Sequence, residues 1–371
     1  MALKAGSCAA ERYETRQVRE EAAVNSSFWV PQEYLARAGW PGQAAKRDQE
    51  RGHSLIKPLV ANSPAKRYIS AMPDSLAGNG SLLSQTKALL HRHRLRALKG
   101  MGQHFLVNSA VLKVITQAAG LSSRDLVIEI GPGMGILTLE LVAQSGYVIA
   151  VELDPRMIEL LEPTLLPHKN FSLINQDILS IEPRDLIERE KDRFPATIAD
   201  PSQYKLVANL PYYITQPIIR HFCEARLKPQ TMVIMVQKEV AQNIVSSPGA
   251  LSILAISVQF YGCPRIVGYV PASSFYPLPK VDSAILEIDL YTRPPVRVSS
   301  EKSFFEIVRA GFCAARKQLA NSLAQGLDMP KPEVLSLIRK AGIDPQKRAE
   351  ALSLEDWARL ENITAEARNK C

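Results

Sequence analysis

Two short segments of this sequence combine residues that are suited to ligand binding or catalysis. The first is the glycine-rich run at residues 131–135 (Gly-Pro-Gly-Met-Gly). It follows the apolar run Leu126–Ile130, which predicts a strand that ends where a helix begins. Glycines at such a junction allow positive φ and let a ligand approach the backbone closely. Because ligands of an open α/β sheet lie at the carboxyl ends of its strands, Gly131 and Gly133 are candidate binding residues. An ordinary turn could use the same glycines, so the interpretation depends on the residues that follow.

Two acidic residues come after the next two predicted strands. Glu152 lies 21 residues after Gly131, at the end of the run Tyr147–Val151, where a carboxylate can accept both ribose hydroxyls of an adenosine-containing ligand. Asp177 follows the run Phe171–Asn175 and could accept a hydrogen bond from an adenine amine. The glycine spacing is G-x-G-x-G, which differs from the G-x-G-x-x-G that suits a pyrophosphate. Together these features favour S-adenosylmethionine over NAD as the cofactor.

The second segment is residues 209–212 (Asn-Leu-Pro-Tyr), after the predicted strand Lys205–Ala208. The exocyclic amine of adenine is a poor nucleophile because its lone pair is delocalised into the ring. The side-chain oxygen of Asn209 and a backbone carbonyl could accept its two N–H bonds and push that lone pair out of the plane. Pro211 adds no competing N–H donor, and Tyr212 offers a ring face for stacking. The segment could be an ordinary turn, but in this position it indicates methyl transfer by positioning and electrostatics.

The chain around these residues alternates between strand-like and helix-like segments. Further strand-like runs follow at Thr231–Gln237, Leu251–Phe260, Ile266–Val270 and Ala284–Leu290. One of the helices should begin with Asp154 as its N-cap and Pro155 at its first position. Repeated βα alternation predicts a doubly wound parallel sheet that is covered on both faces. We therefore expect an α/β fold, a Rossmann-like methyltransferase domain over residues 81–292.

The chain after residue 292 has a helical pattern, and we expect a small C-terminal helical domain over residues 293–371. The helical segments are 302–327, 331–341 and 353–367. Pro330 should separate the first two, and Gly342 and Asn362 are candidate helix ends.

The first 80 residues lack any sustained periodicity of 3.6 or 2.0, and we expect a disordered leader there. They contain no apolar core of a secretory signal, and their early acids, Glu11, Glu14, Glu20 and Glu21, are unusual for an organelle transit peptide. The leader is then either dispensable or a regulatory or targeting arm.

Composition excludes several classes of protein. The chain has 371 residues, of which 46% are hydrophobic and 22% charged, as is ordinary for a globular protein of about two domains. No apolar run approaches the ~20 residues that span a bilayer. The five cysteines form no CxxC or Cys/His cluster, so we expect no metal, no disulfide framework and a reducing, cytoplasmic location. The net charge of +8 is compatible with a polyanionic partner.

These segments together resemble the ribosomal RNA adenine dimethyltransferase family. The resemblance starts with residues 102–106 (Gly-Gln-His-Phe-Leu) and continues through the glycine loop, the two acids and residues 209–214. Later blocks that agree are Gln237–Val240, Phe275–Ser283 and Arg316–Leu323. The blocks occur in the order of the family from about Leu82 to the C-terminus, and they are most similar to the bacterial branch that acts on 16S rRNA.

The resemblance implies the reaction and its partners. Family members transfer four methyl groups from S-adenosylmethionine to the N6 amines of two adjacent adenosines in a hairpin loop near the 3′ end of small-subunit rRNA. The expected partner is 16S rRNA within an immature small ribosomal subunit, met by a monomeric enzyme without a membrane. The alternatives are adenine methylation of 23S rRNA or DNA, and a methylation-independent role as an rRNA-binding assembly factor.

The resemblance also implies roles for single residues. The cofactor-binding residues would be His104, Leu106, Gly131, Gly133, Glu152, Asp177 and Asn209, and the catalytic residues Asn209, Leu210, Tyr212 and Phe275. Tyr212 and Phe275 would sandwich the flipped base. The family more often has Asn at the position of His104, and a contact to the cofactor through the backbone would survive that exchange.

Two groups of basic residues are candidates for contact with RNA phosphates, which would make binding salt-dependent. The candidates are Arg92, Arg94, Arg96, Arg309, Arg316 and Lys317. Arg309 and Arg316 are seven residues apart, which would place them on one helical face. In both groups a solvated helix face is an equally good interpretation.

Overall fold

The computed structural model describes residues 81–93, 103–314 and 316–368. The predicted leader and two of the candidate RNA-binding residues, Arg94 and Arg96, lie outside the described residues. Within the described ranges, no helix has the length and apolar character that are needed to cross a membrane.

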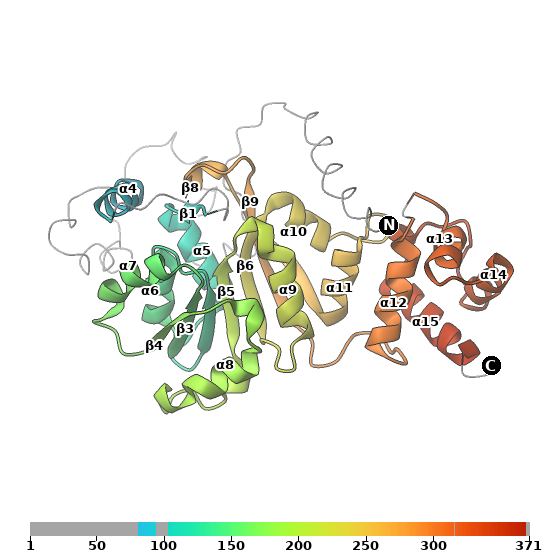
Figure 1. Ribbon diagram of the computed structural model, residues 1–371, viewed down its shortest axis with the longest axis horizontal. Coiled ribbons are helices and arrows are strands. Elements are labelled where there is room, and N and C mark those ends of the chain that lie inside the picture. The colour runs from blue at the N-terminus through green and yellow to red at the C-terminus, as the bar shows by residue number, and fades with distance from the viewer. Residues whose placement is uncertain (1–80, 94–102, 315, 369–371) are drawn as a thin grey trace, which may run out of the picture.

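A seven-stranded sheet forms the centre of the fold (Figure 1), with strand order β4-β3-β2-β5-β6-β9-β7. Its strands are β2 (Leu126–Ile130), β3 (Tyr147–Glu152), β4 (Phe171–Asn175), β5 (Lys205–Asn209), β6 (Thr231–Gln237), β7 (Gly262–Val270) and β9 (Ser283–Leu290). A separate two-stranded sheet pairs β1 (Phe105–Leu106) with β8 (Phe275–Tyr276). The first five strands of the main sheet are parallel neighbours, so their carboxyl ends meet at one edge.

The expectation of a wholly parallel sheet was wrong at one side. Strand β9 runs antiparallel to both of its neighbours, β6 and β7. No α-helix lies between β7 and β9, and a connection without a crossover helix joins antiparallel strands rather than parallel ones.

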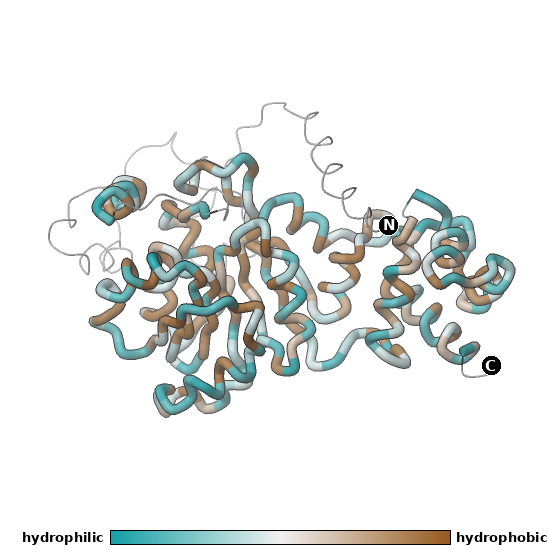
Figure 2. Tube along the Cα trace, viewed as in Figure 1, coloured by the Kyte–Doolittle hydropathy of each residue, from teal (hydrophilic) through white to brown (hydrophobic). Residues whose placement is uncertain are grey.

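Helices cover both faces of the sheet and continue beyond its end. They are α4 (Leu82–Arg92), α5 (Ser109–Ala119), α6 (Ile136–Gln144), α7 (Pro155–Leu165), α8 (Pro183–Glu190), α9 (Thr215–Glu224), α10 (Lys238–Ile244), α11 (Ile253–Tyr261), α12 (Glu301–Phe312), α13 (Leu319–Gly326), α14 (Lys331–Lys340) and α15 (Leu354–Arg368). Successive residues of a strand face opposite sides, and β2 shows this: Val127 packs in one apolar core with α5, α6 and α7, whereas Ile128 packs in the other with α8 to α11. Hydrophobic residues are accordingly concentrated on the strands (Figure 2).

The run Leu251–Phe260 is a helix and not the strand that its apolar character suggested. Helix α11 covers most of it, and five of the nine helical residues are buried. A short apolar run that is buried on several sides does not distinguish strand from helix by periodicity. The signal that favours the helix is Ser252, whose hydroxyl accepts the N–H of Ala255 at 3.1 Å as an N-cap.

The C-terminal helices differ from expectation in two places. The predicted helix 302–327 is two helices, α12 and α13, because the carbonyl of Ala314 accepts the N–H of Lys317 and the hydroxyl of Ser322 in a turn. Asn362 lies inside α15 and not at its end. Pro330 does precede α14, and Gly342 follows that helix with a φ of +69°.

The C-terminal helices lie at the end of the molecule opposite β4 (Figure 1). Phe304 of α12 stacks on Phe260 of α11 with ring centroids 4.7 Å apart, and Phe305 meets the same ring edge-on at 5.2 Å. The apolar core is therefore continuous from the sheet into these helices.

Candidate active site

One pocket lies at the carboxyl ends of β2, β3 and β5, where the polar segments of the sequence meet. The predicted site residues that line it are His104, Leu106, Gly131, Gly133, Glu152, Asp177, Asn209, Leu210 and Tyr212. These residues come from segments more than 100 positions apart in the chain, so the topology of the sheet brings them together.

The glycine loop is shaped by backbone conformations that L-residues rarely adopt. Gly131 has a φ of +66° and nothing within 4 Å of the place where a Cβ would be, so its backbone is open to the pocket. Gly135 has a φ of +78°, and a Cβ there would come within 2.5 Å of Leu161. The first glycine thus leaves room for a ligand, whereas the last allows α6 to pack close to α7.

The carboxylate of Glu152 is held in a fixed position at the end of β3. One oxygen accepts the N–H of Gly133 at 3.2 Å and the other accepts the N–H of Asp154 at 2.9 Å. Burial raises the pKa of Glu152 above its ordinary value, while these two hydrogen bonds act to lower it. A backbone hydrogen bond from Leu153 also acts to lower this pKa, so the main chain around the site orients the carboxylate.

Glu129 is a pocket residue to which the sequence analysis gave no role. It is fully buried, and its Oε2 has no hydrogen-bond partner among the described residues. Burial raises the pKa of Glu129 to about 8, and the nearby Glu152 acts in the same direction. An acid in the middle of the apolar strand β2 was the signal that could have drawn attention to it.

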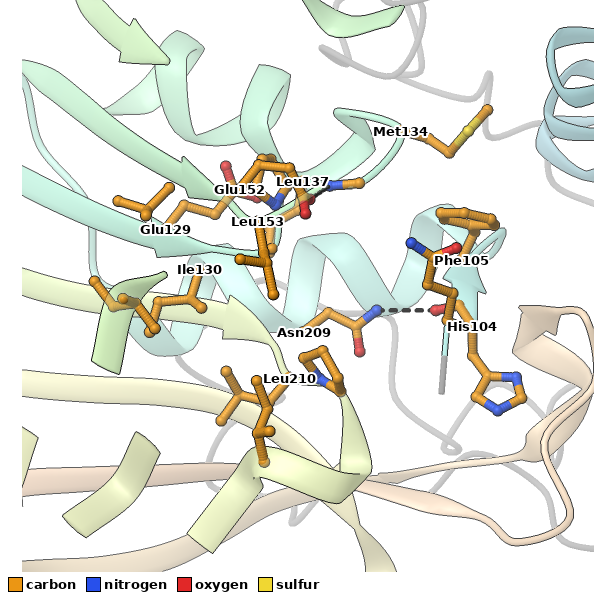
Figure 3. A pocket seen from close by; sticks show the side chains of 18 of the residues that line it. His104, Phe105, Glu129, Ile130, Met134, Leu137, Glu152, Leu153, Asn209 and Leu210 are labelled. Carbon is orange, nitrogen blue, oxygen red and sulfur yellow. Dashed lines mark hydrogen bonds between the residues drawn. The ribbon is translucent and has the colours of Figure 1, made fainter. Parts of the chain in front are cut away.

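Asn209 ends β5 and lies between Glu152 and His104 (Figure 3). Its Nδ2 donates to the backbone carbonyl of His104 at 3.2 Å. The next residue, Leu210, is buried and its N–H donates to the carbonyl of Met235 at 3.2 Å, which ties the segment to β6. The amide of Asn209 is therefore oriented by the segment before β1.

Tyr212 and His104 stack on each other, with ring centroids 5.7 Å apart and an interplanar angle of 28°. A hydrogen bond of 2.7 Å joins the Tyr212 hydroxyl to that of Ser283, and burial raises the pKa of the phenol. Nδ1 of His104 lies 2.8 Å from the carbonyl of Pro277, as expected of a donating tautomer. The imidazole is thus engaged by Tyr212 and Pro277, while the backbone of His104 is engaged by Asn209.

The remaining predicted site residues have different surroundings. Asp177 lies at the rim of the pocket, where it is exposed and accepts the N–H of Leu179 at 3.0 Å. Phe275 is only 3% exposed and does not line the pocket. Pairing of β8 with β1 places Phe275 opposite Leu106 and packs both side chains in the same apolar core. Phe275 thus lies in the core rather than in the pocket lining, and its sandwich of a base with Tyr212 stays a prediction.

Among the described RNA-binding candidates, Arg92 ends α4 and is exposed. Arg309 is exposed on α12, but Arg316 and Lys317 lie in the turn between α12 and α13. The prediction that Arg309 and Arg316 share one helical face was wrong, because α12 ends at Phe312.

The sheet order, its single reversed strand and the glycine loop followed by Glu152 and Asn209 define a Rossmann-like, S-adenosylmethionine-dependent methyltransferase. The model of the ribosomal RNA adenine dimethylase family matches residues 94–366. The chain belongs to this family, whose substrate is rRNA.

Similarity to individual proteins supports the same family assignment. The chain is 48% identical over 289 residues to the "Ribosomal RNA small subunit methyltransferase A" of Dehalococcoides mccartyi, which covers 78% of this chain and 96% of that protein. It is 39% identical over 280 residues to the protein of that name from Clostridium botulinum, covering 74% of this chain and 96% of that protein. Among solved structures, a dimethyladenosine transferase from Plasmodium falciparum matches with a TM-score of 0.58 and 25% identity over 72% of this chain and 98% of that one. The 23S rRNA methyltransferase ErmE matches with a TM-score of 0.55 and 27% identity over 70% of this chain and 98% of that one.

Proposed function

We propose that this protein transfers four methyl groups from S-adenosylmethionine to the N6 amines of two adjacent adenosines in the 3′-terminal hairpin loop of 16S rRNA. The similarity that supports this target is the 48% identity to a small-subunit methyltransferase along nearly its whole length. The fold alone does not separate the targets, because the TM-scores to a dimethyladenosine transferase and to a 23S rRNA enzyme are close, 0.58 and 0.55.

The pocket fits the cofactor. An unpartnered, buried carboxyl oxygen of Glu129 beside the glycine loop suits a ligand that carries an amino group. The open backbone face of Gly131 leaves room for the methionine part, and the fixed carboxylate of Glu152 would accept the ribose hydroxyls. Asp177 at the rim would accept the adenine amine, and the chain near His104 and Leu106 would close the pocket. When bound, S-adenosylmethionine supplies an activated methyl group on its sulfur.

The residues after β5 prepare the target amine. Because the Nδ2 of Asn209 is bonded to His104, its Oδ1 is free to accept one N–H of the adenine amine. The carbonyl of Leu210 would accept the other N–H, which directs the nitrogen lone pair toward the methyl group. Tyr212 would stack on the flipped base after its ring separates from that of His104. Catalysis then depends on position and electrostatics, and the proton that each transfer releases passes to solvent without a dedicated base.

We further propose that the enzyme works as a monomer in the cytoplasm on an immature small subunit. Residues 81–292 would form the methyltransferase domain and residues 293–371 the helical domain, while residues 1–80 would be a leader that the reaction does not need. Mass spectrometry of the native N-terminus tests the last point, because a start near Ser81 supports a dispensable leader and an intact leader contradicts it.

The experiment that tests the function uses the full chain, labelled S-adenosylmethionine, and small and large ribosomal subunits from a strain that lacks the modification. We expect label in the small subunit alone, with primer extension stopping at two adjacent adenosines. The Asn209→Ala variant should leave these positions unmodified. Label in the large subunit would contradict the proposed target, and full dimethylation by Asn209→Ala would contradict the role of Asn209.

A further inference from the structure

A second cavity lies at the carboxyl end of β6 and has a volume of about 470 Å³. Its lining includes Gln237, Lys238, Glu239, Gln242, Lys280 and Asp282. The proposed reaction gives none of these residues a role, although all but Gln242 belong to two of the segments by which the sequence resembles its family.

This cavity adjoins the reaction pocket through a short series of contacts. Gln237, which lines the cavity, is the partner of Ser283 in the register of β6 and β9. The hydroxyl of Ser283 is 2.7 Å from that of Tyr212, which lines the reaction pocket. Ser283 therefore connects the two linings, through its register partner Gln237 on one side and the hydroxyl of Tyr212 on the other.

The two lysines of this cavity are available to an anion. Neither forms an ion pair with a carboxylate in the part of the chain that the structure describes, and Nζ of Lys238 instead lies 5.2 Å from the ring centroid of Tyr269. Of the two acids in the lining, Asp282 accepts the N–H of Ala272 at 2.9 Å. Glu239 is exposed to solvent. The two lysines thus have no direct ion-pair partner among the described residues, although the lining as a whole, with Asp282 and Glu239, balances in formal charge.

We propose that this second cavity binds the phosphodiester next to the target adenosine, with Lys238 and Lys280 as the cations that hold it. The inference rests on the proposed function, because the ligand is a segment of the same RNA loop. When a base is flipped into the reaction pocket, its sugar and phosphate stay at the mouth, and the neighbouring nucleotide must lie close by. Two adjacent adenosines have to enter the reaction pocket in turn, and a fixed hold on the flanking phosphate would set which of them enters. The amides of Gln237 and Gln242 add donors to that phosphate or its ribose.

The test compares two double variants of the full chain. Lys238→Gln with Lys280→Gln removes both cations from the cavity. The matched control is Lys228→Gln with Lys169→Gln. Nζ of Lys228 lies 5.4 Å from the ring centroid of Tyr261, much as that of Lys238 lies over Tyr269. Lys228, however, precedes β6 and so lies at the opposite edge of the sheet. Lys169 precedes β4 at that same edge and is exposed. For each protein, kcat/KM with unmethylated small subunits is measured over a range of KCl concentrations, and cofactor affinity is measured by calorimetry.

We expect the dependence of log kcat/KM on log salt concentration to become shallower by about 0.7 for each cavity lysine removed, which is the slope for one phosphate contact in single-stranded nucleic acid. The cofactor affinity of the cavity variant and the salt dependence of the control variant should equal those of the unaltered chain. A double variant with Lys238→Gln and Lys280→Arg should have the slope of the Lys238→Gln single variant. An unchanged slope in the cavity variant, or an equal change in the control pair, would overturn the inference. Failure of the unaltered chain to methylate small subunits would instead overturn the proposed function.

Discussion

Asn209 donates its amide N–H to the backbone carbonyl of His104, a residue 105 positions earlier in the chain. The bond connects the segment before β1 to the end of β5, and it leaves the side-chain oxygen of Asn209 directed away from His104 (Figure 3). A residue far away in sequence therefore decides which atom of the amide meets the substrate.

The first prediction concerns this orientation. Asn209→Asp keeps an acceptor but replaces the donating NH₂ with a second oxygen, which the carbonyl of His104 repels. We expect kcat on small subunits to fall on the order of 100-fold, the loss typical of removing one preorganised polar group. Single-turnover methylation with labelled S-adenosylmethionine measures it. Asn170→Asp, a change of the same type at an amide that donates to the carbonyls of Val142 in α6 and Ser145 just after it, should leave kcat unchanged. A rate for Asn209→Asp equal to that of this control would disprove the role.

The second prediction distinguishes the role of the His104 imidazole from the role of the His104 backbone carbonyl. His104→Ala removes the stack on Tyr212 and the bond to Pro277, but it keeps the carbonyl that orients Asn209. We expect the free energy of unfolding to fall by about 1 kcal/mol, while the cofactor Kd stays the same. Urea unfolding and calorimetric titration measure the two quantities, with His168→Ala as the comparison. A large rise in the cofactor Kd would mean that the imidazole itself contacts the cofactor.

The third prediction separates backbone strain from ligand contact in the glycine loop. Gly131→Ala and Gly120→Ala introduce a methyl group at similar φ values, +66° and +53°, and neither meets an atom within 4 Å. Both should lower the free energy of unfolding by about 1 kcal/mol. Gly131 faces the pocket and Gly120 follows α5 outside it, so only Gly131→Ala should weaken cofactor binding, by about tenfold or more. Equal cofactor affinity in the two variants would remove Gly131 from the binding site.

The fourth prediction follows from the burial of Glu129. Its pKa is about 8 in the folded protein, above the ordinary value of 4.5, so the unfolded chain releases this proton at lower pH than the folded one. Stability contributed by the protonated carboxyl is complete below pH 4.5 and is lost as the pH rises to 8. Glu129→Gln should remove this loss, which amounts to roughly 5 kcal/mol over the whole shift. Urea unfolding between pH 5 and 8 measures it, with the exposed Glu159→Gln as control, and identical pH profiles for Glu129→Gln and the unaltered chain would contradict it.

The sequence predicted those parts of the fold that depend on local pattern. β2, β4 and β6 begin and end at the predicted residues, and Asp154 caps α7 through the N–H of Arg156. Alternation and capping are read from neighbouring residues, and a strand that is buried on both faces has a clear apolar run.

What the sequence did not predict depends on contacts between distant segments. The reversal of β9 follows from the connection that precedes it, and burial of α11 on several sides hides the helical period of its apolar run. Nothing near Phe275 indicates that its pairing with Leu106 takes the ring into the core. Glu129 was missed because its chemistry arises from the lack of a partner, which only the packed structure reveals.

The pairing of β1 with β8 also sets when the enzyme becomes competent during its own synthesis. His104 and its partner Pro277 are 173 positions apart, and the two-stranded sheet beside them closes one side of the pocket. A nascent chain that has emerged only as far as β6 already has the glycine loop, Glu152 and Asn209, but it lacks the strand against which β1 folds. The two-stranded sheet that closes this side of the pocket therefore cannot form until about three quarters of the polypeptide has been made.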